Sequence, residues 1–299
     1  RHLHMPATVL PALALVLNAL IFGLSWWPFR ELQELGLHAL WATALTFIFM
    51  TVCLLAVRPG AWFRLLRNGQ LWWLLGASGL TNVCFNWAVT TGDVVRVVLL
   101  FYLMPAWSLL LAWPLLDEKP RGTALLRLAL ALTGVLIVLK TPDAAWPIPH
   151  SRADWLALMG GFCFALTNVM LRRLEHTPND ARMLAMFAGA AIMASGAAAL
   201  GVHLGVVTAM PTQATGWLGL AALMGIALMV GNLALQYGAA RLAASTTAII
   251  MLTEVVFASL SSVMLGAAQW SARTAIGGAL IVLASLLAAV DSGSDQHPG

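Results

Sequence analysis

The sequence predicts an all-α polytopic membrane protein whose ten transmembrane helices form two inverted five-helix repeats. Three observations predict this fold class: the composition, a succession of apolar runs, and a weak internal repeat. Of the 299 residues, 61% are hydrophobic and only 9% are charged, and the mean hydropathy is +0.86. Because soluble domains carry about a quarter charged residues, a chain with so few charges could not cover a surface that faces water. Lipid is therefore the expected solvent.

Ten apolar runs each reach the length of about 20 residues with which a helix crosses a bilayer. In the first half they cover residues 8–28, 37–57, 70–91, 95–116 and 123–140. In the second half they cover residues 153–173, 182–203, 216–239, 243–266 and 273–290. The longest polar connection lies near the middle of the chain. We therefore expect a first repeat at residues 5–141, a second repeat at 152–291 and a polar tail at 292–299.

The distribution of Lys and Arg predicts the orientation, because cytoplasmic loops are enriched in both. If the N-terminus is cytoplasmic, eleven of the sixteen basic residues fall on the cytoplasmic side of the membrane. The other five fall on the opposite side, and they are Arg30, Arg96, Lys140, Arg152 and Arg273. Both termini are therefore predicted to be cytoplasmic.

A weak internal repeat supports the division into halves. An offset of 149 residues aligns residues 87–118 with 236–267 without a gap, and an offset of 142 aligns residues 22–30 with 164–172. Each half has five spans, which is an odd number, so the second half must enter the membrane from the opposite side. Inverted repeats of this kind are a hallmark of secondary transporters, whose halves enclose a substrate site.

Two pairs of amide side chains lie inside predicted spans. Asn82 and Asn86 are four residues apart in the third span, and Asn232 and Gln236 repeat that spacing in the eighth. This spacing places both amides of a pair on one face of a helix. Polar groups in hydrocarbon usually face a cavity or a neighbouring helix. The pairs therefore indicate either a polar cavity between the halves or hydrogen bonds that join helices.

Aromatic and polar residues recur at matching positions of the first and sixth spans. Trp26 aligns with Asn168 at the offset of 142 residues, and Phe164 lies one turn before Asn168. These three side chains could form walls of the cavity. Packing against lipid or against another helix is the alternative for Trp26.

A proline interrupts the fourth span near its middle. Pro105 removes a backbone donor and should kink the helix, which exposes carbonyl groups that a cavity could use. Tyr102 and Met104 flank the expected kink. A purely structural bend is the alternative.

Glu254 is the only carboxylate near the centre of any predicted span. Because hydrocarbon disfavours a charged side chain, its presence there indicates a proton-coupling site or a partner for a substrate ammonium group. A protonated side chain bonded to nearby backbone is the alternative. Asp93 and Arg96, at the turn between the third and fourth spans, could pair as a gate or form a solvated loop pair.

Two segments carry a resemblance to a known family. Tyr102-Leu103-Met104-Pro105-Ala106-Trp107 leads to Leu116-Asp117-Glu118, and Thr253-Glu254-Val255-Val256-Phe257-Ala258 leads to Leu265-Gly266-Ala267. Together with the ten spans, these segments resemble the EamA type of the drug/metabolite transporter superfamily (DMT). The pattern of that family is Leu-Glu-Pro-Val-Phe-Ala followed by Leu-Gly-Glu. Val255 therefore stands in place of a proline, and Ala267 stands in place of a glutamate.

Within that family the chain looks most like the YddG-type exporters of aromatic and other neutral amino acids. The resemblance implies a multi-pass protein of the bacterial inner (cytoplasmic) membrane. It also implies export by alternating access through a central cavity formed by both halves. Glu254 is the candidate for proton coupling. The residues expected to bind the substrate are Trp26, Asn82, Asn86, Tyr102, Met104, Pro105, Phe164, Asn168, Asn232 and Gln236.

The expected partners are a small-molecule substrate and the lipid bilayer, without a cofactor, a metal or a nucleic acid. The net charge of +4 comes without a basic stripe that could follow a phosphate backbone. Cys53, Cys84 and Cys163 lie far apart within apolar runs and show no metal-ligand spacing. The sequence is compatible with a monomer.

Other functions remain as alternatives. An aromatic cavity with one glutamate would also suit a lipophilic cation, as in multidrug efflux. Anionic substrates such as nucleotide sugars would need basic residues facing the cavity, and only Arg96 and Arg127 come close. An intramembrane enzyme would need catalytic groups within the spans, where the sequence has no HExxH motif and no Ser/His arrangement. A structural membrane protein would lack a hydrated cavity.

Overall fold

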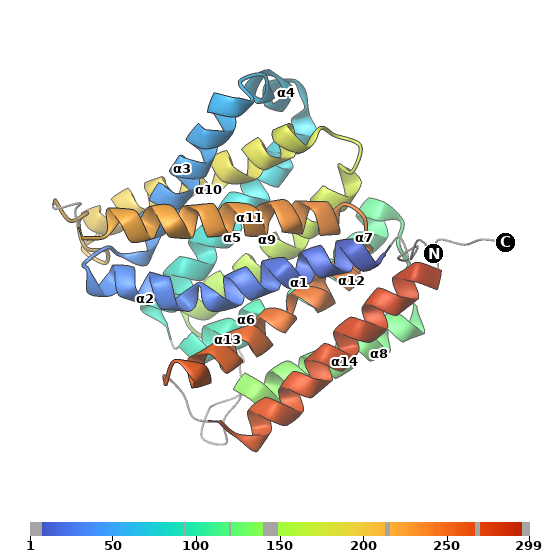
Figure 1. Cartoon of the computed structure of the whole chain (residues 1–299). Helices are drawn as coiled ribbons and strands as arrows, with labels where there is room; N and C mark the ends of the chain where they lie inside the picture. Colours follow the sequence, from blue (N-terminus) through green and yellow to red (C-terminus); the bar gives the residue numbers. More distant parts are fainter. Residues whose placement is uncertain are drawn as a thin grey trace, which may run out of the picture.

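The computed structural model describes residues 8–92, 94–119, 121–139, 149–212, 216–266 and 270–294, which form fourteen α-helices and no strand (Figure 1). The helices of the first half are α1 (Val9–Leu24), α2 (Trp26–Glu34), α3 (Ala39–Val57), α4 (Ala61–Arg67), α5 (Gly69–Thr91), α6 (Val94–Phe101), α7 (Met104–Leu116) and α8 (Gly122–Leu139). Those of the second half are α9 (Arg152–Arg173), α10 (Asn179–His203), α11 (Leu218–Ala239), α12 (Ala244–Met251), α13 (Thr253–Met264) and α14 (Ala272–Ser294).

The helices make up ten spans, close to the boundaries that the sequence predicts. Within the described residues, nine helical segments are long and apolar enough to cross a membrane. Three of them are interrupted spans, in which α1 continues into α2, α6 into α7, and α12 into α13. The tenth span is α5, a helix of 23 residues that packs along α9 and α10 inside the bundle. Its amides, hydroxyls and glycines make it less apolar than the other nine. The all-helical fold with ten spans is therefore confirmed.

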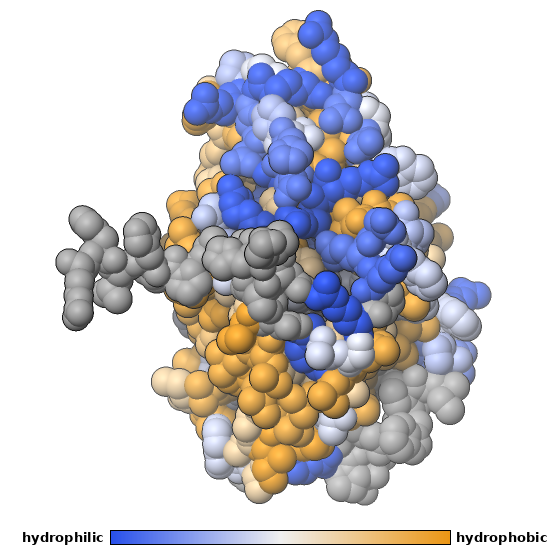
Figure 2. Space-filling view, turned by 90° about the vertical axis from the view of Figure 1, so that its right-hand side faces the viewer, coloured by the Kyte–Doolittle hydropathy of each residue, from blue (hydrophilic) through white to orange (hydrophobic). Residues whose placement is uncertain are grey.

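Both ends of the described chain lie at the same end of the bundle, where α1 begins and α14 ends (Figure 1). We call this end of the bundle the terminal face. An even number of spans requires this arrangement, and five spans per half place the start of α9 at the opposite end. Figure 2 looks onto the terminal face and shows hydrophilic residues gathered over it, with apolar residues along the flank. The terminal face is thus the polar end of a bundle with apolar sides.

Two of the three interrupted spans break next to a proline. Pro105 cannot donate to the carbonyl of Phe101, and α6 accordingly ends at Phe101 while α7 begins at Met104. The break that the sequence predicts at Pro105 is confirmed. Pro28 likewise cannot donate to the carbonyl of Leu24, the last residue of α1.

The third break, at Leu252, has no proline beside it. Hydrogen bonds of the i to i−3 type replace the helical ones here, because the amide of Leu252 donates to Ile249 and that of Val255 donates to Leu252. The hydroxyl of Thr253 also donates to the carbonyl of Ile250, at 2.7 Å. The ninth span therefore bends at the level where the fourth span bends, by a different local mechanism.

Glycine pairs allow some helices to approach very closely. A Cβ atom on Gly134 of α8 would lie 2.7 Å from the carbonyl oxygen of Gly277 in α14, and one on Gly277 would lie 2.6 Å from that of Gly134. A Cβ atom on Gly189 of α10 would overlap the carbonyl of Leu75 in α5. Small residues at such crossings allow backbones to pack in lipid.

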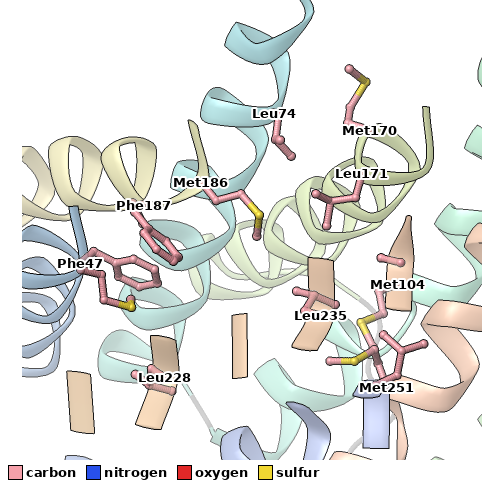
Figure 3. Packing of buried hydrophobic residues seen from close by; sticks show 14 of the residues in the cluster. Phe47, Leu74, Met104, Met170, Leu171, Met186, Phe187, Leu228, Leu235 and Met251 are labelled. Atoms are coloured by element: carbon pink, nitrogen blue, oxygen red, sulfur yellow. The ribbon is translucent and has the colours of Figure 1, made fainter. Parts of the chain in front are cut away.

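The hydrophobic core joins the two halves. Phe47 of α3 and Phe187 of α10 have ring centroids 6.2 Å apart, and both belong to the main cluster of buried residues. Figure 3 shows their side chains together with Met186, and Met104 beside Met251 at the junction of α7 with α12. The core thus lies between the halves.

Candidate functional site

A cavity of about 110 Å³ lies at the middle of the spans. Helices of both halves form it: α1, α3, α5 and α6 from the first, and α9 to α13 from the second. It adjoins the breaks of the fourth and ninth spans, because Tyr102 and Glu254 line it. The described lining residues are Asn18, Phe22, Phe47, Ser78, Thr81, Asn82, Phe85, Phe101, Tyr102, Phe164, Thr167, Met186, Asn232, Leu235, Met251 and Glu254.

Aromatic rings form a continuous wall of this cavity. The ring of Phe101 lies 4.7 Å from that of Phe85, 5.9 Å from that of Tyr102 and 5.9 Å from that of Phe164, measured between centroids. These rings come from α5, the α6–α7 break and α9, so the wall crosses from one half to the other. Tilted and edge-on contacts of this kind are favourable for aromatic side chains. The wall is suited to the apolar part of a ligand.

Three asparagines supply the amide groups of the lining. Asn82 donates through Nδ2 to the carbonyl of Ser78 at 3.0 Å, and Asn232 donates through Nδ2 to the carbonyl of Leu228 at 2.9 Å. Asn18 donates to the carbonyl of Gly231 at 2.7 Å and so ties α1 to α11. Each amide nitrogen carries a second hydrogen. The amides of Asn82 and Asn232 therefore keep one donor and one oxygen for a ligand.

Three hydroxyls of the lining already donate their hydrogens to backbone carbonyls. Ser78 donates to the carbonyl of Met186 at 3.3 Å, Thr81 donates to that of Ala77 at 2.8 Å, and Thr167 donates to that of Cys163 at 3.0 Å. Because each hydroxyl has a single hydrogen, only its oxygen lone pairs remain for a ligand. The described lining is therefore richer in acceptors than in donors.

Glu254 supplies the only charge among the described lining residues. It is the second residue of α13, directly after the break in the ninth span. Gly23 brings α1 against this point, since a Cβ atom there would lie 2.8 Å from the carbonyl oxygen of Glu254. Within the described chain, neither the Glu254 carboxyl nor the Tyr102 hydroxyl has a hydrogen bond or an ion pair. Both groups are available to a ligand.

The structure brings five of the predicted site residues to the cavity: Asn82, Tyr102, Phe164, Asn232 and Glu254. The other six do not line it. Two of these join helices, because Trp26 donates to the hydroxyl of Ser261 at 3.0 Å and Asn86 donates to that of Thr43 at 2.8 Å. The remaining four are buried in the bundle, and they are Met104, Pro105, Asn168 and Gln236.

Each predicted amide pair therefore has one member that lines the cavity and one that does not. Asn82 and Asn232 line the cavity, whereas Asn86 bonds to α3 and Gln236 is only 3% exposed. The amide groups of Gln236 and Asn168 are buried and lack hydrogen-bond partners in the described part of the chain. Both readings that the sequence left open, lining and helix joining, thus apply to different members of one pair.

Sequence reasoning missed four of the six aromatic side chains among the described lining residues. Phe22, Phe47, Phe85 and Phe101 line the cavity, but a phenylalanine in an apolar span carries no signal of its own. Helical spacing was the available clue, because Phe22 lies four residues after Asn18 and Phe85 lies three residues after Asn82. Such spacings place the ring beside the amide on one helix face.

One other predicted feature, the gate between Asp93 and Arg96, is not tested by the geometry. Asp93 lies outside the described residues, as does the side chain of Arg96, so the gate expected between them has no structural description. Among the described residues, no group of three or more His, Cys, Asp or Glu side chains could hold a metal ion.

The terminal face is closed by contacts between the halves. Glu118, just after α7, accepts a hydrogen bond from the amide of Ala244 at 3.3 Å and faces Arg172 of α9 at 3.8 Å. Arg172 also donates to the carbonyl of Ala240 at 3.0 Å. α7 packs against α12 here, whereas α6 and α13, their counterparts toward the opposite face, make no comparable contact within the described chain. Within the described residues, the fourth and ninth spans thus pack on each other mainly toward the terminal face.

Both the sequence and the fold are similar to those of known proteins. Residues 9–140 and residues 151–290 each match the model of the EamA-like transporter family. The fold is similar to that of a solved structure described as "Crystal structure of protein", with a TM-score of 0.74 and 18% sequence identity. That similarity covers 96% of this chain and 99% of the other, and at this identity it shows the fold alone. None of the curated proteins matches the chain.

Proposed function

Because the chain belongs to the EamA-like transporter family, we propose that it exports small molecules that carry an amino group on an apolar or aromatic body. Neutral amino acids with hydrophobic side chains are the first candidates, as in YddG-type exporters. One observation carries the proposal. Glu254 is the single charge among the described lining residues, and five phenylalanines line the same cavity.

Recognition of the amino group rests on the acceptors of the cavity. A substrate ammonium would pair with the Glu254 carboxylate and with the amide oxygens of Asn82 and Asn232. Hydrogen bonds to a charged group contribute about 1.5–3 kcal/mol each. With no Lys, Arg or His among the described lining residues, nothing there repels a cation. The apolar body of the substrate would lie against the aromatic wall.

The carboxylate of an amino acid would rely on neutral donors. The hydroxyl of Tyr102 and the remaining amide hydrogens of Asn82 and Asn232 are the candidates in the described lining. These donors are fewer than the acceptors, so the same geometry favours a second class, lipophilic amines without a carboxylate. We therefore keep lipophilic-cation efflux as the alternative function.

Glu254 also suits a role in proton coupling. A proton and a substrate ammonium would compete for the same carboxylate, so that release of one accompanies binding of the other. Such competition would couple export of the substrate to entry of a proton. The position of Glu254 at the break of the ninth span supports this role, because the carboxyl lies beside the bend about which that span could move.

Alternating access is supported by the unequal packing of the fourth and ninth spans at the two ends. α7 packs on α12 toward the terminal face, and the inverted repeat offers the mirrored arrangement, in which α6 would pack on α13. Exchange between these arrangements would open the cavity to each side in turn. With the terminal face in the cytoplasm, as the basic residues predict, the structure would represent the state closed to the cytoplasm. The proposed location is the bacterial inner membrane.

Flux measurements in liposomes test the proposed substrate class. Purified protein is reconstituted, and uptake of radiolabelled phenylalanine and of its decarboxylated amine, phenethylamine, is measured with and without a pH gradient. We expect flux of the amino acid, accelerated by the gradient. Glu254→Gln should reduce it on the order of tenfold, the effect of one lost charge-assisted hydrogen bond. Glu34→Gln, at an exposed ion pair with Arg30, is the matched control.

The outcomes separate the alternatives. Flux of the amine without flux of the amino acid would favour lipophilic-cation efflux. Absence of flux for both compounds would reject the proposed substrate class. Equal flux in Glu254→Gln and in the wild type, with or without a pH gradient, would remove the coupling role of this residue.

A further inference from the structure

A second cavity, of about 550 Å³, opens at the terminal face between the two halves. Residues from α7, α8 and the connection between them line it on one side, and residues from α9, α12 and the connection between α11 and α12 line it on the other. We call it the terminal recess. Its described lining contains five basic side chains, which are Lys119, Arg121, Arg127, Arg172 and Arg241. It is separate from the central cavity, because the two share no lining residue.

Basic side chains outnumber acidic ones among the described lining residues of the terminal recess. Asp117 and Glu118 are the two carboxylates among its described lining residues. Glu118 is already engaged, since it faces Arg172 at 3.8 Å and accepts from the amide of Ala244 at 3.3 Å. Arg172 also pairs with Glu175 at 2.6 Å. An anion that entered the recess would meet basic side chains from both halves.

Two of the arginines are held in place by backbone carbonyls. Arg127 is 9% exposed and donates to the carbonyls of Thr123 at 3.1 Å and Leu287 at 3.4 Å. Arg172 donates to the carbonyl of Ala240 at 3.0 Å. Because these bonds fix the guanidinium groups before a ligand arrives, less conformational entropy is lost on binding. The recess is therefore partly preorganised for an anion.

The remaining cations are more accessible. Arg121 and Arg241 are exposed, and the guanidinium of Arg241 lies 3.9 Å from the centroid of the Tyr237 ring. Buried apolar residues, Leu109, Ala112 and Leu242, form part of the lining beneath the charged groups. A headgroup could therefore be bound by cations while an attached acyl chain contacts apolar side chains.

From this arrangement we propose that the terminal recess binds a phosphate group. Guanidinium groups match phosphate oxygens in a bidentate geometry and remain charged at all physiological pH values. The recess lies at the ends of the spans, which is the depth of lipid headgroups, and basic pockets between transmembrane helices bind anionic headgroups. The phosphate could belong to an anionic lipid or be free in solution.

Binding measurements on the full chain test this site. Protein purified in a neutral detergent is titrated with cardiolipin, with phosphatidylcholine and with inorganic phosphate. Native mass spectrometry detects bound lipid, and the shift in melting temperature against sodium chloride of equal ionic strength detects bound phosphate. The recess variant is Arg121→Gln combined with Arg241→Gln. The control is Arg58→Gln combined with Arg67→Gln, two exposed arginines of the α3–α4 region that do not line the recess.

We expect saturable binding to the wild type and to the control, and binding at least about tenfold weaker to the recess variant, because charge-assisted contacts are lost. Saturation by cardiolipin but not by phosphate would identify the lipid headgroup as the source. Saturation by phosphate alone would identify the free anion. Equal weakening in the control and recess variants would overturn the proposal. So would phosphatidylcholine binding as tightly as cardiolipin. If the double variant fails to fold, the same comparison is made with Arg241→Gln against Arg58→Gln.

Discussion

At the residue scale, Glu118 shows how the fold changes the chemistry of a side chain. It lies between the fourth and fifth spans, with 28% of its side chain exposed. Burial raises the pKa of Glu118 above its ordinary value of 4.5, although the amide of Ala244 and the guanidinium of Arg172 act in the opposite direction. The nearby Glu175 raises it as well. Desolvation therefore outweighs the ion pair at this site.

This shift predicts how stability depends on pH. A carboxyl whose pKa is higher in the folded state binds its proton more tightly there, so ionisation destabilises the fold. The melting temperature of the wild type, relative to that of Glu118→Gln, should therefore fall as the pH rises from 4.5 through the raised pKa of Glu118. Thermal unfolding in detergent measures both melting temperatures across this pH range. Glu34→Gln is the control, and a relative melting temperature that rises with pH would contradict the prediction.

The candidate site could be predicted from the sequence only where a residue type is unusual for its surroundings. Asn82, Asn232 and Glu254 stand out in apolar spans, and all three line the cavity. Asn86 is equally unusual but bonds to Thr43. The spacing of residues predicts the helix face on which a side chain lies only to within about one residue. A rotation of that size decides whether the side chain faces the cavity or a neighbouring helix. Phe22 and Phe101 are ordinary in such spans, and their residue type alone gave no signal.

At the element scale, the contact of α5 with α10 depends on glycine. A Cβ atom on Gly189 would overlap the carbonyl of Leu75, and one on Gly79 would lie 2.6 Å from the carbonyl oxygen of Gly189. Backbone atoms cannot move aside as a flexible side chain can. The close approach of the two helices is therefore possible only without side chains at these positions.

Two substitutions on the same helix test this dependence. Gly189→Ala should destabilise the protein by about 1–3 kcal/mol, the usual cost of overpacking. Gly196→Ala, where nothing lies within 4 Å of the added Cβ atom, should be neutral or stabilise by up to about 1 kcal/mol because alanine favours the helix. Melting temperatures in one detergent compare the two variants. Equal effects would show that the close contact does not limit packing.

The helix breaks show which features can be predicted from residues that are close in the sequence. Pro105 predicts the break in the fourth span because proline lacks a backbone N–H donor in any helix. The break at Leu252 depends on hydrogen bonds of the i to i−3 type and on the Thr253 hydroxyl. Threonine makes similar bonds in unbroken helices, as Thr43 does in α3. The break at Leu252 could therefore not be predicted from its residues.

At the scale of the whole molecule, contacts at the terminal face join the two halves. Glu118 and Ala244 belong to different halves and are joined by a hydrogen bond. Arg64 and Asp180 form a second ion pair between the halves. If access alternates, these contacts must separate whenever the cavity opens at the terminal face.

A covalent link across these contacts should therefore stop transport. Cys53, Cys84 and Cys163 are first replaced by alanine, and cysteines are then introduced at positions 118 and 244. Oxidation should reduce flux in liposomes to the background, because the terminal face can no longer open. Reduction of the same sample should restore it. Undiminished flux after complete cross-linking would rule out opening at this place.

Orientation is the second prediction at this scale. Gly205, in the connection after α10, lies at the end of the bundle opposite to Arg58. In the same cysteine-free background, Gly205→Cys should react with an impermeant thiol reagent in intact cells. Arg58→Cys should react only after the cells are permeabilised. The reverse pattern would place the terminal face outside and would reverse the proposed direction of transport.

The modest hydropathy of α5 bears on how the protein is made. This helix carries the amides of Asn82 and Asn86, and its main neighbours are α9 and α10. Those partners emerge from the ribosome only after the whole first half has been synthesised. Until then, α5 would hold its polar side chains against lipid, or it would wait in the translocon. Biogenesis of the first half therefore depends on the second, and a chain that stops after α8 should leave α5 poorly inserted.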